Sequence, residues 1–119
     1  MKTITDGIRD RLRSDLNAAR AARRSGDWVR CWQLLEDAHV LSQPWALWHV
    51  RVHGSMLAAG ARAGDGREVW GQLVRLVVAG PGSATGRYPV GNTGRARVSA
   101  TRPMPIRDDL AELLRAAGR

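Results

Sequence analysis

All three histidines of the chain fall within fifteen residues of one another, at His39, His49 and His53. His49 and His53 are four residues apart, a spacing that places two side chains on one helical face, one turn from each other. Neutral imidazole is a strong ligand for transition metals. The spacing therefore predicts a metal site, provided that the helices carrying these residues turn them inward.

Two carboxylates are candidates to complete this site. Glu36 and His39 form a Glu-x-x-His pair, whose members can reach one ion from a single helix, and Asp15 falls within an apolar stripe of the first helical segment. A buried charge is costly unless it is paired or coordinated. The pattern is similar to the inward Glu and Glu-x-x-His ligands of helical-bundle metal proteins, although only one such motif is present. The predicted ligands are His39, His49, His53, Glu36 and Asp15.

The same residues have a second interpretation, a buried hydrogen-bond network without metal, in which Glu36 pairs with His39 and Asp15 pairs with an arginine. If a metal binds, imidazole and carboxylate ligands favour iron or zinc, with copper or manganese as further candidates, over calcium or magnesium. A bound metal could activate water or dioxygen. The sequence leaves open whether the protein is an enzyme.

Hydrophobic periodicity predicts an all-α fold, a small antiparallel bundle of about four helices with a short C-terminal helix. Asp27 and Asp65 are expected N-caps, and Gly64 and the sequence Gly80-Pro81-Gly82 are expected helix ends. The expected segments are about 6–24, 28–41, 45–63, 66–79 and 107–117. We expect a single domain over residues 1–119, with the bundle over 6–80 and a long ordered loop, rich in Gly, Pro and Arg, over 81–106.

The fourth segment has a polar face formed by Glu68, Gln72 and Arg75. This face either contacts solvent, as the helical wheel favours, or abuts the histidines, where it would form a second shell around the site. Tryptophans at helical spacing are expected in the core. They are Trp28, Trp32, Trp45, Trp48 and Trp70.

The long loop contains a Gly-Asn-Thr-Gly sequence followed by further arginines. Successive backbone amides in such a stretch can form an anion-binding nest, and the alternative is a tight turn. The candidate anion-binding residues are Arg87, Gly91, Asn92, Thr93 and Gly94. The expected ligand is a small anionic molecule.

The chain has 119 residues and a formal net charge of +8, and 18 of its 19 basic residues are arginine. Residues 69–107 carry six arginines and no acidic residue. Few aromatic residues accompany them, which argues against binding of single-stranded nucleic acid. Cys31 is the only cysteine, and no signal peptide or membrane-spanning run is visible, so we expect a cytoplasmic protein without membrane contact.

Several short motifs, taken in order, resemble a family of small bacterial proteins described as a domain of unknown function. The motifs are Ala38-His39-Val40-Leu41-Ser42-Gln43, His49-Val50 with His53, Glu68-Val69-Trp70-Gly71-Gln72, Gly91-Asn92-Thr93-Gly94 and Pro103-Met104-Pro105-Ile106. The resemblance spans about residues 15–110 and implies no activity.

An alternative to a metal-binding protein is an interaction module. Residues 26–44 are similar to one tetratricopeptide-type helix, and the basic surface would bind a protein or nucleic acid while the histidines stay structural. No second copy follows at 34 residues, which argues against a repeat array. A large exposed apolar patch would favour this alternative.

Overall fold

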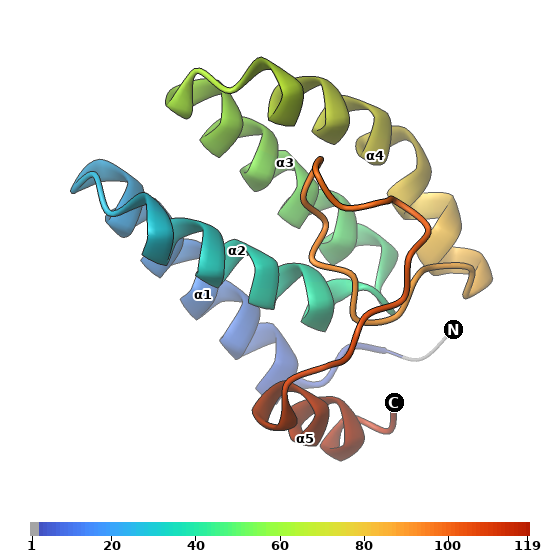
Figure 1. The fold of residues 1–119 in the computed structure, drawn as a ribbon. Coiled ribbons are helices and arrows are strands. Elements are labelled where there is room, and N and C mark those ends of the chain that lie inside the picture. The colour runs from blue at the N-terminus through green and yellow to red at the C-terminus, as the bar shows by residue number, and fades with distance from the viewer. Residues whose placement is uncertain (1–2) are drawn as a thin grey trace.

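A computed structural model describes residues 3–119, and helices are the only regular elements among them (Figure 1). The predicted all-α class is confirmed. The helices are α1 (Asp6–Arg24), α2 (Trp28–Ser42), α3 (Ala46–Ala63), α4 (Gly66–Thr85) and α5 (Asp108–Ala116).

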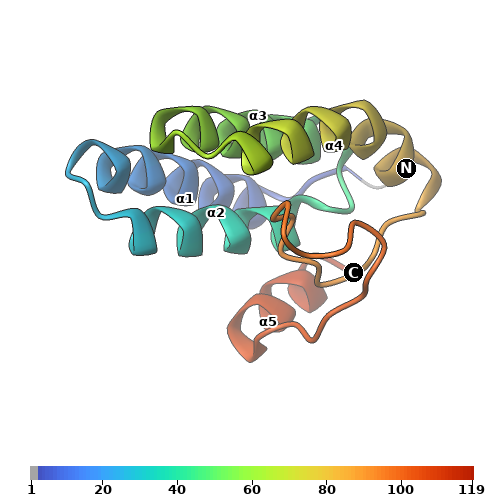
Figure 2. The same ribbon diagram turned by 45° about the horizontal axis from the view of Figure 1, so that its top comes forward.

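The first four helices form two antiparallel pairs, α1 with α2 and α3 with α4 (Figure 2). The two pairs are joined along the contact between α2 and α3, and α5 packs across α1 and α2. Large apolar side chains fill the centre, including Leu12, Leu35, Val52 and Met56, each at most 2% exposed. Within residues 3–119, none of the helices has the length and apolar character needed to cross a bilayer.

Side-chain caps explain where several helices begin. The carboxylates of Asp27 and Asp65 accept hydrogen bonds from the backbone N–H groups of Arg30 and Glu68, which confirms both predicted N-caps. Gly64 ends α3 in the left-handed conformation, with φ of 70°, as a glycine C-cap should. The short connections between these helices force neighbours to run antiparallel.

The fourth helix is longer than its sequence predicts. It continues through Gly80-Pro81-Gly82 to Thr85, so the expected end near Ala79 and the expected loop start at residue 81 are both wrong. Pro81 cannot donate to the carbonyl of Val77, but both residues lie on the exposed face, where water can bind that carbonyl. The extra turns bring Ser83 into the interior.

The fourth helix also turns its polar face inward. One stripe of α4 is buried and mostly polar, and it consists of Glu68, Gln72, Arg75, Ala79 and Ser83. The opposite face leaves Trp70 69% exposed and Val77 75% exposed, so the expectation that every tryptophan lies in the core is wrong for Trp70. Polar groups inside the protein need partners, and these partners are the histidines and the long loop.

The segment from Gly86 to α5 has no regular structure, and its first half lies against α2 and α4 (Figure 1). The Asn92 amide holds this segment in shape by donating to the carbonyls of Ser99 at 2.9 Å and Arg102 at 2.7 Å. Gly91 has a φ of 81°, and a Cβ atom there would lie 1.9 Å from the Met104 carbonyl oxygen. This position therefore requires glycine.

Candidate metal centre

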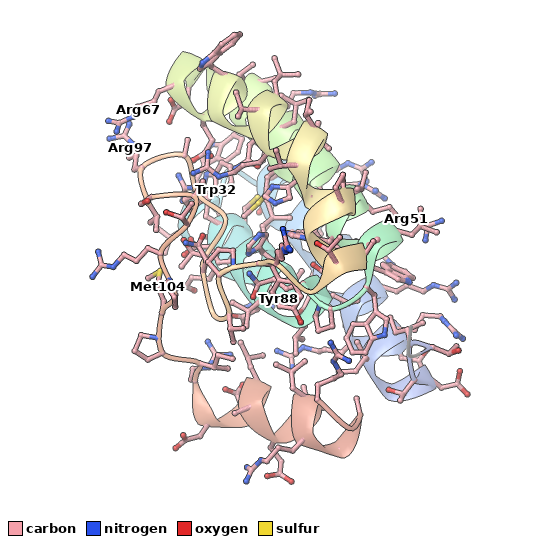
Figure 3. All side chains as sticks on the ribbon, turned by 90° about the vertical axis from the view of Figure 1, so that its right-hand side faces the viewer. Trp32, Arg51, Arg67, Tyr88, Arg97 and Met104 are labelled. Carbon is pink, nitrogen blue, oxygen red and sulfur yellow. The ribbon has the colours of Figure 1, made fainter. Side chains whose placement is uncertain are left out.

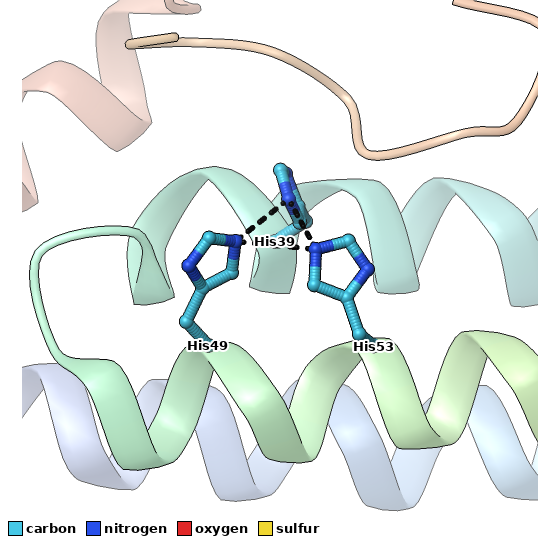
Figure 4. A group of neighbouring side chains, drawn as sticks. All are labelled: His39, His49 and His53. Atoms are coloured by element: carbon cyan, nitrogen blue, oxygen red, sulfur yellow. Dashed lines mark hydrogen bonds between the residues drawn. The ribbon is translucent and has the colours of Figure 1, made fainter. Parts of the chain in front are cut away.

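The three histidines meet in the interior between α2 and α3 (Figure 4). His39 comes from α2, and His49 and His53 come from successive turns of α3. Each side chain is at most 5% exposed. Their Nε2 atoms form a triangle, with separations of 3.1 Å from His39 to each of the others and 3.2 Å between His49 and His53.

The Nδ1 atoms point outward from this triangle, and each meets an oxygen. His39 Nδ1 lies 2.6 Å from the backbone carbonyl of Asn92, which can only accept a hydrogen bond. His49 Nδ1 lies 2.7 Å from Ser83 Oγ, and that hydroxyl donates its own proton to the Gln43 carbonyl. Both contacts therefore require a proton on Nδ1.

His53 is fixed in the same way through Gln72. The Gln72 Oε1 atom lies 2.6 Å from His53 Nδ1, and the Gln72 amide nitrogen donates to Glu68 Oε2 at 2.7 Å and to the Gly94 carbonyl at 2.8 Å. A carboxylate and a carbonyl can only accept from that nitrogen, so the amide orientation is determined. The third imidazole thus also carries its proton on Nδ1.

Three neutral imidazoles with protons on Nδ1 present three lone pairs to one another. No Nε2 atom has a proton to donate, so the short contacts inside the triangle are not satisfied as hydrogen bonds. Buried acceptors without a donor are destabilising. A cation at the centre of the triangle would satisfy all three.

Burial keeps these imidazoles neutral. Desolvation, and then the charge of neighbouring His53, lowers the pKa of His49 to about 3. Desolvation also lowers the pKa of His53 to about 4 and holds the pKa of His39 well below its usual value. Neutral imidazole is the form that binds metal, so the ligands are ready at neutral pH.

The triangle also has the size of a metal site. Nitrogen ligands about 2.0–2.1 Å from one ion lie about 2.8–3.4 Å apart when the angles at the ion are about 90–110°. The observed separations of 3.1–3.2 Å fall inside this range. Among residues 3–119, these three histidines form the group whose potential ligand atoms lie close enough to share one ion.

A charged network supports Gln72 from behind. Glu68 is 1% exposed, and it accepts hydrogen bonds from Arg95 Nε at 2.6 Å and from the Ala96 N–H at 2.9 Å. Burial alone would raise its pKa, but the hydrogen bonds from Arg95, Gln72 and Ala96 lower it overall. Arg95 in turn lies over the Trp32 ring at 3.7 Å. The chain Glu68–Gln72–His53 therefore orients one imidazole through an anchored carboxylate.

The long loop touches the histidines directly at Gly94. A Cβ atom at this position would lie 2.6–2.9 Å from three atoms of the His39 ring, and the φ of Gly94 is 82°. Only glycine lets the backbone lie this close to the imidazole in that conformation. The loop therefore packs against the site.

A cleft of about 630 Å³ leads to the three histidines. Its walls come from α4 and the loop and are mainly apolar, with Val74, Val78, Ala100 and Pro103 among them. This volume is within the usual range for small-molecule sites, about 300–1,000 Å³. The cleft thus borders the buried histidines on one side.

The two predicted carboxylate ligands have other partners. Asp15 is bonded by Arg11 at 3.0 and 3.1 Å, and burial, opposed by Arg11, raises its pKa. Glu36 pairs with Arg95 at 3.5 Å, and burial raises its pKa as well. The structure therefore places Asp15 and Glu36 in ion pairs and leaves three imidazoles as the grouped ligands.

The expected anion nest in the loop is not open to a ligand. The backbone N–H of Gly91 donates to Gln43 Oε1, that of Asn92 donates to the Pro89 carbonyl, and that of Gly94 donates to Asn92 Oδ1. Thr93 Oγ1 accepts from the Arg95 N–H at 3.5 Å. The loop instead supplies a carbonyl to His39, while Arg87 lines the cleft.

Sequence reasoning did not find Ser83 or Gln43. The expected helix end at Gly80-Pro81-Gly82 places Ser83 in the loop, and Gln43 falls between two expected helices. The available signal is the spacing of Glu68, Gln72, Ala79 and Ser83, which keeps one helical face through the proline.

Comparison with known proteins identifies the family of the chain. A search of curated proteins and a search of solved structures gave no match. A family model described as "Protein of unknown function (DUF3703)" matches residues 6–114, nearly the whole sequence. The chain therefore belongs to the DUF3703 family.

Proposed function

We propose that this protein binds one transition-metal ion through the Nε2 atoms of His39, His49 and His53. The observation that carries the proposal is the contact geometry, since each Nδ1 atom faces an oxygen that can accept its proton and the three Nε2 atoms converge. A buried hydrogen-bond network would alternate donors and acceptors. This triangle does not, and a cation is the species that suits it.

The cleft supports a site with an exchangeable coordination position. Catalytic zinc sites keep three protein ligands and an open position, whereas structural sites are closed by a fourth protein ligand. Three histidines form the group here, and they line a cleft that a small molecule can enter. We therefore favour a site that exchanges ligands over one that only stabilises the fold.

Iron and zinc fit the ligand set best, and copper and manganese are further candidates. Three neutral imidazoles without thiolate suit these metals. Cys31, the single cysteine, is buried against a different cavity lined by residues of α1 and α3. A metal held this way can activate bound water or dioxygen. The protein would hold the imidazoles in one tautomer and shape access through the cleft.

Elemental analysis tests the proposal. Tag-free protein purified without chelator, and the same protein reconstituted with Zn²⁺ or Fe²⁺, should contain one metal ion per chain. His49→Ala and His53→Ala should each reduce the ratio to near zero. Gln33→Ala, a change on the exposed face of α2, should leave it unchanged. Retention of stoichiometric metal in both histidine variants would refute the site.

The outer face of α4 favours a second function, association with a second copy of this chain. Trp70, Leu73 and Val77 are 44–75% exposed on one side of the helix. Apolar patches of this kind mark interaction sites. Arg67 is the one charged residue exposed on α4, and an antiparallel pair of α4 helices would place the two Arg67 side chains at opposite ends.

Light scattering during size exclusion tests this second function. We expect a dimer for the natural sequence and a monomer for Val77→Glu. Val29→Glu on α2 is the matched control, because Val29 is 71% exposed and Val77 is 75% exposed. A monomer at all concentrations for the natural sequence would contradict the association.

A further inference from the structure

The cleft beside the histidines contains an arginine that forms no salt bridge. Arg75 is 9% exposed, and its Nη1 and Nη2 atoms donate to the carbonyls of Gly71 at 3.1 Å and Val98 at 2.8 Å. Among the ion pairs between described residues, none includes Arg75. A buried cation is costly unless it is compensated, so this position favours a negative charge nearby.

The electrostatics of the whole cleft point the same way. Arg75 and Arg87 line it, and no Asp or Glu does so among residues 3–119. The cleft is therefore positive before any metal binds.

A bound dication would increase this excess. Behind the cleft lining, Glu36 and Glu68 both form ion pairs with Arg95, and the charge of Glu68 also acts on Arg75. A dication on three neutral imidazoles would then add two uncompensated positive charges. An anion at the open coordination position would neutralise part of this excess, and it would lie on the side that Arg75 lines.

The walls of the cleft favour an anion that also has an apolar part. Val74, Val78, Ala100 and Pro103 give the cleft an apolar lining, and its volume of about 630 Å³ exceeds that of a single inorganic anion. Burial of an apolar group against this lining favours binding by about 25 cal/mol per Å² of buried area. Guanidinium suits a planar carboxylate, to which it can donate in a fork.

We infer that the cleft binds a small organic carboxylate with an apolar body, whose carboxylate lies between the metal and Arg75. This inference rests on the proposed metal site. The carboxylate would replace a solvent ligand at the open position, and the alkyl part would lie against the apolar walls. Inorganic anions lack the alkyl part, and neutral alcohols lack the charge.

Cobalt(II) provides a probe, because its visible absorption changes when a ligand enters its coordination shell. Protein loaded with one equivalent of Co²⁺ would be titrated with isobutyrate, acetate, inorganic phosphate and isobutanol. We expect saturable spectral changes with isobutyrate at a dissociation constant roughly tenfold below that of acetate, as two buried methyl groups would give. Phosphate should bind more weakly than isobutyrate, and isobutanol should give no change.

Arginine variants test whether Arg75 contributes to isobutyrate binding. Arg75→Gln should weaken isobutyrate binding at least tenfold at unchanged Co²⁺ stoichiometry, and Arg75→Lys should recover part of the affinity. Arg97→Gln is the control, because Arg97 is an exposed arginine of the long loop that pairs with Asp65 and lies away from Tyr88 of the cleft (Figure 3). It should bind isobutyrate as the natural sequence does.

The outcomes separate this inference from the metal site. If the protein takes up one Co²⁺ but isobutyrate leaves the spectrum unchanged, the carboxylate site is refuted and the metal site stands. Equal binding by the natural sequence and folded Arg75→Gln, or tighter binding of phosphate than of isobutyrate, also refutes it. If no Co²⁺ binds, both proposals fail.

Discussion

At the scale of single residues, the proton on each Nδ1 atom determines what the histidines can do. Three different acceptors hold these protons: a backbone carbonyl, a serine hydroxyl and a glutamine side chain. Outer partners of this kind orient metal ligands, and their loss typically weakens metal affinity 10–100-fold. The residues behind the imidazoles therefore matter almost as much as the imidazoles.

Ser83→Ala tests this role. Removal of the hydroxyl leaves His49 Nδ1 without its acceptor and lets the imidazole change tautomer or rotate. We expect the dissociation constant for Zn²⁺, measured by competition with a chromophoric chelator, to rise about 10–100-fold. Ser14→Ala on the exposed face of α1 is the control. An unchanged affinity in Ser83→Ala would show that the serine does not orient a ligand.

At the scale of elements, the fourth helix and the long loop supply the groups that orient the three histidines. A helical wheel correctly predicts that His39, His49 and His53 face inward, because apolar neighbours share their faces. The wheel fails for α4, whose apolar side faces outward and whose polar side is buried. Periodicity identifies two faces of a helix, but only tertiary contacts decide which face is buried.

Only part of the polar network around the site could be predicted from the sequence. Asp15 lies in an apolar stripe, as the wheel indicates, and the neighbouring Arg11 satisfies its charge, as the hydrogen-bond interpretation predicts. The hydrogen bond from His39 to the Asn92 carbonyl joins residues 53 positions apart, and its acceptor is a backbone atom. Backbone acceptors carry no sequence signal, so such a contact is visible only in the structure.

Gly94→Ala tests the contact between the long loop and the His39 ring of α2. The added methyl group would overlap the His39 ring, and the positive φ would be strained. We expect a loss of about 1–2 kcal/mol in unfolding free energy from the strain, together with weaker Zn²⁺ binding. Gly26→Ala has a similar φ of 80° and open space around it, so it should lose stability without losing Zn²⁺ affinity. Equal Zn²⁺ affinity in both variants would contradict the contact.

At the scale of the whole molecule, metal binding and folding are coupled, because the ligands come from two helices that meet only in the folded chain. A ligand that binds only the native state raises the unfolding free energy by about 4 kcal/mol at 1,000 times its dissociation constant. We expect Tm to rise by about 10–25 °C on metal loading and to fall again with EDTA. Calorimetry checks this, and identical curves with and without verified metal would contradict it.

The metal-free protein should also lose stability in mild acid. The histidines have folded pKa values of about 3 and 4 for His49 and His53, well below the ordinary value of 6.5. Below pH 6.5 the unfolded chain therefore binds more protons, and stability falls as pH decreases toward the folded values. Above about pH 7 this contribution is constant.

We expect a slope of about 1–4 kcal/mol per pH unit between pH 6 and pH 5, since each unmatched proton gives about 1.4 kcal/mol per unit. Urea unfolding at several pH values measures this slope. His49→Ala should reduce it. A flat profile in the metal-free natural sequence would mean that the histidines are protonated equally in both states.

X-ray absorption spectroscopy of the protein loaded with one equivalent of Zn²⁺ tests the central claim most directly. We predict about three imidazole nitrogens at about 2.0–2.1 Å, with the multiple scattering typical of histidine and one light-atom ligand in addition. His53→Ala should lose the ordered signal. A shell containing sulfur, a shell of oxygen atoms without imidazole scattering, or a protein that binds no Zn²⁺ would contradict the account.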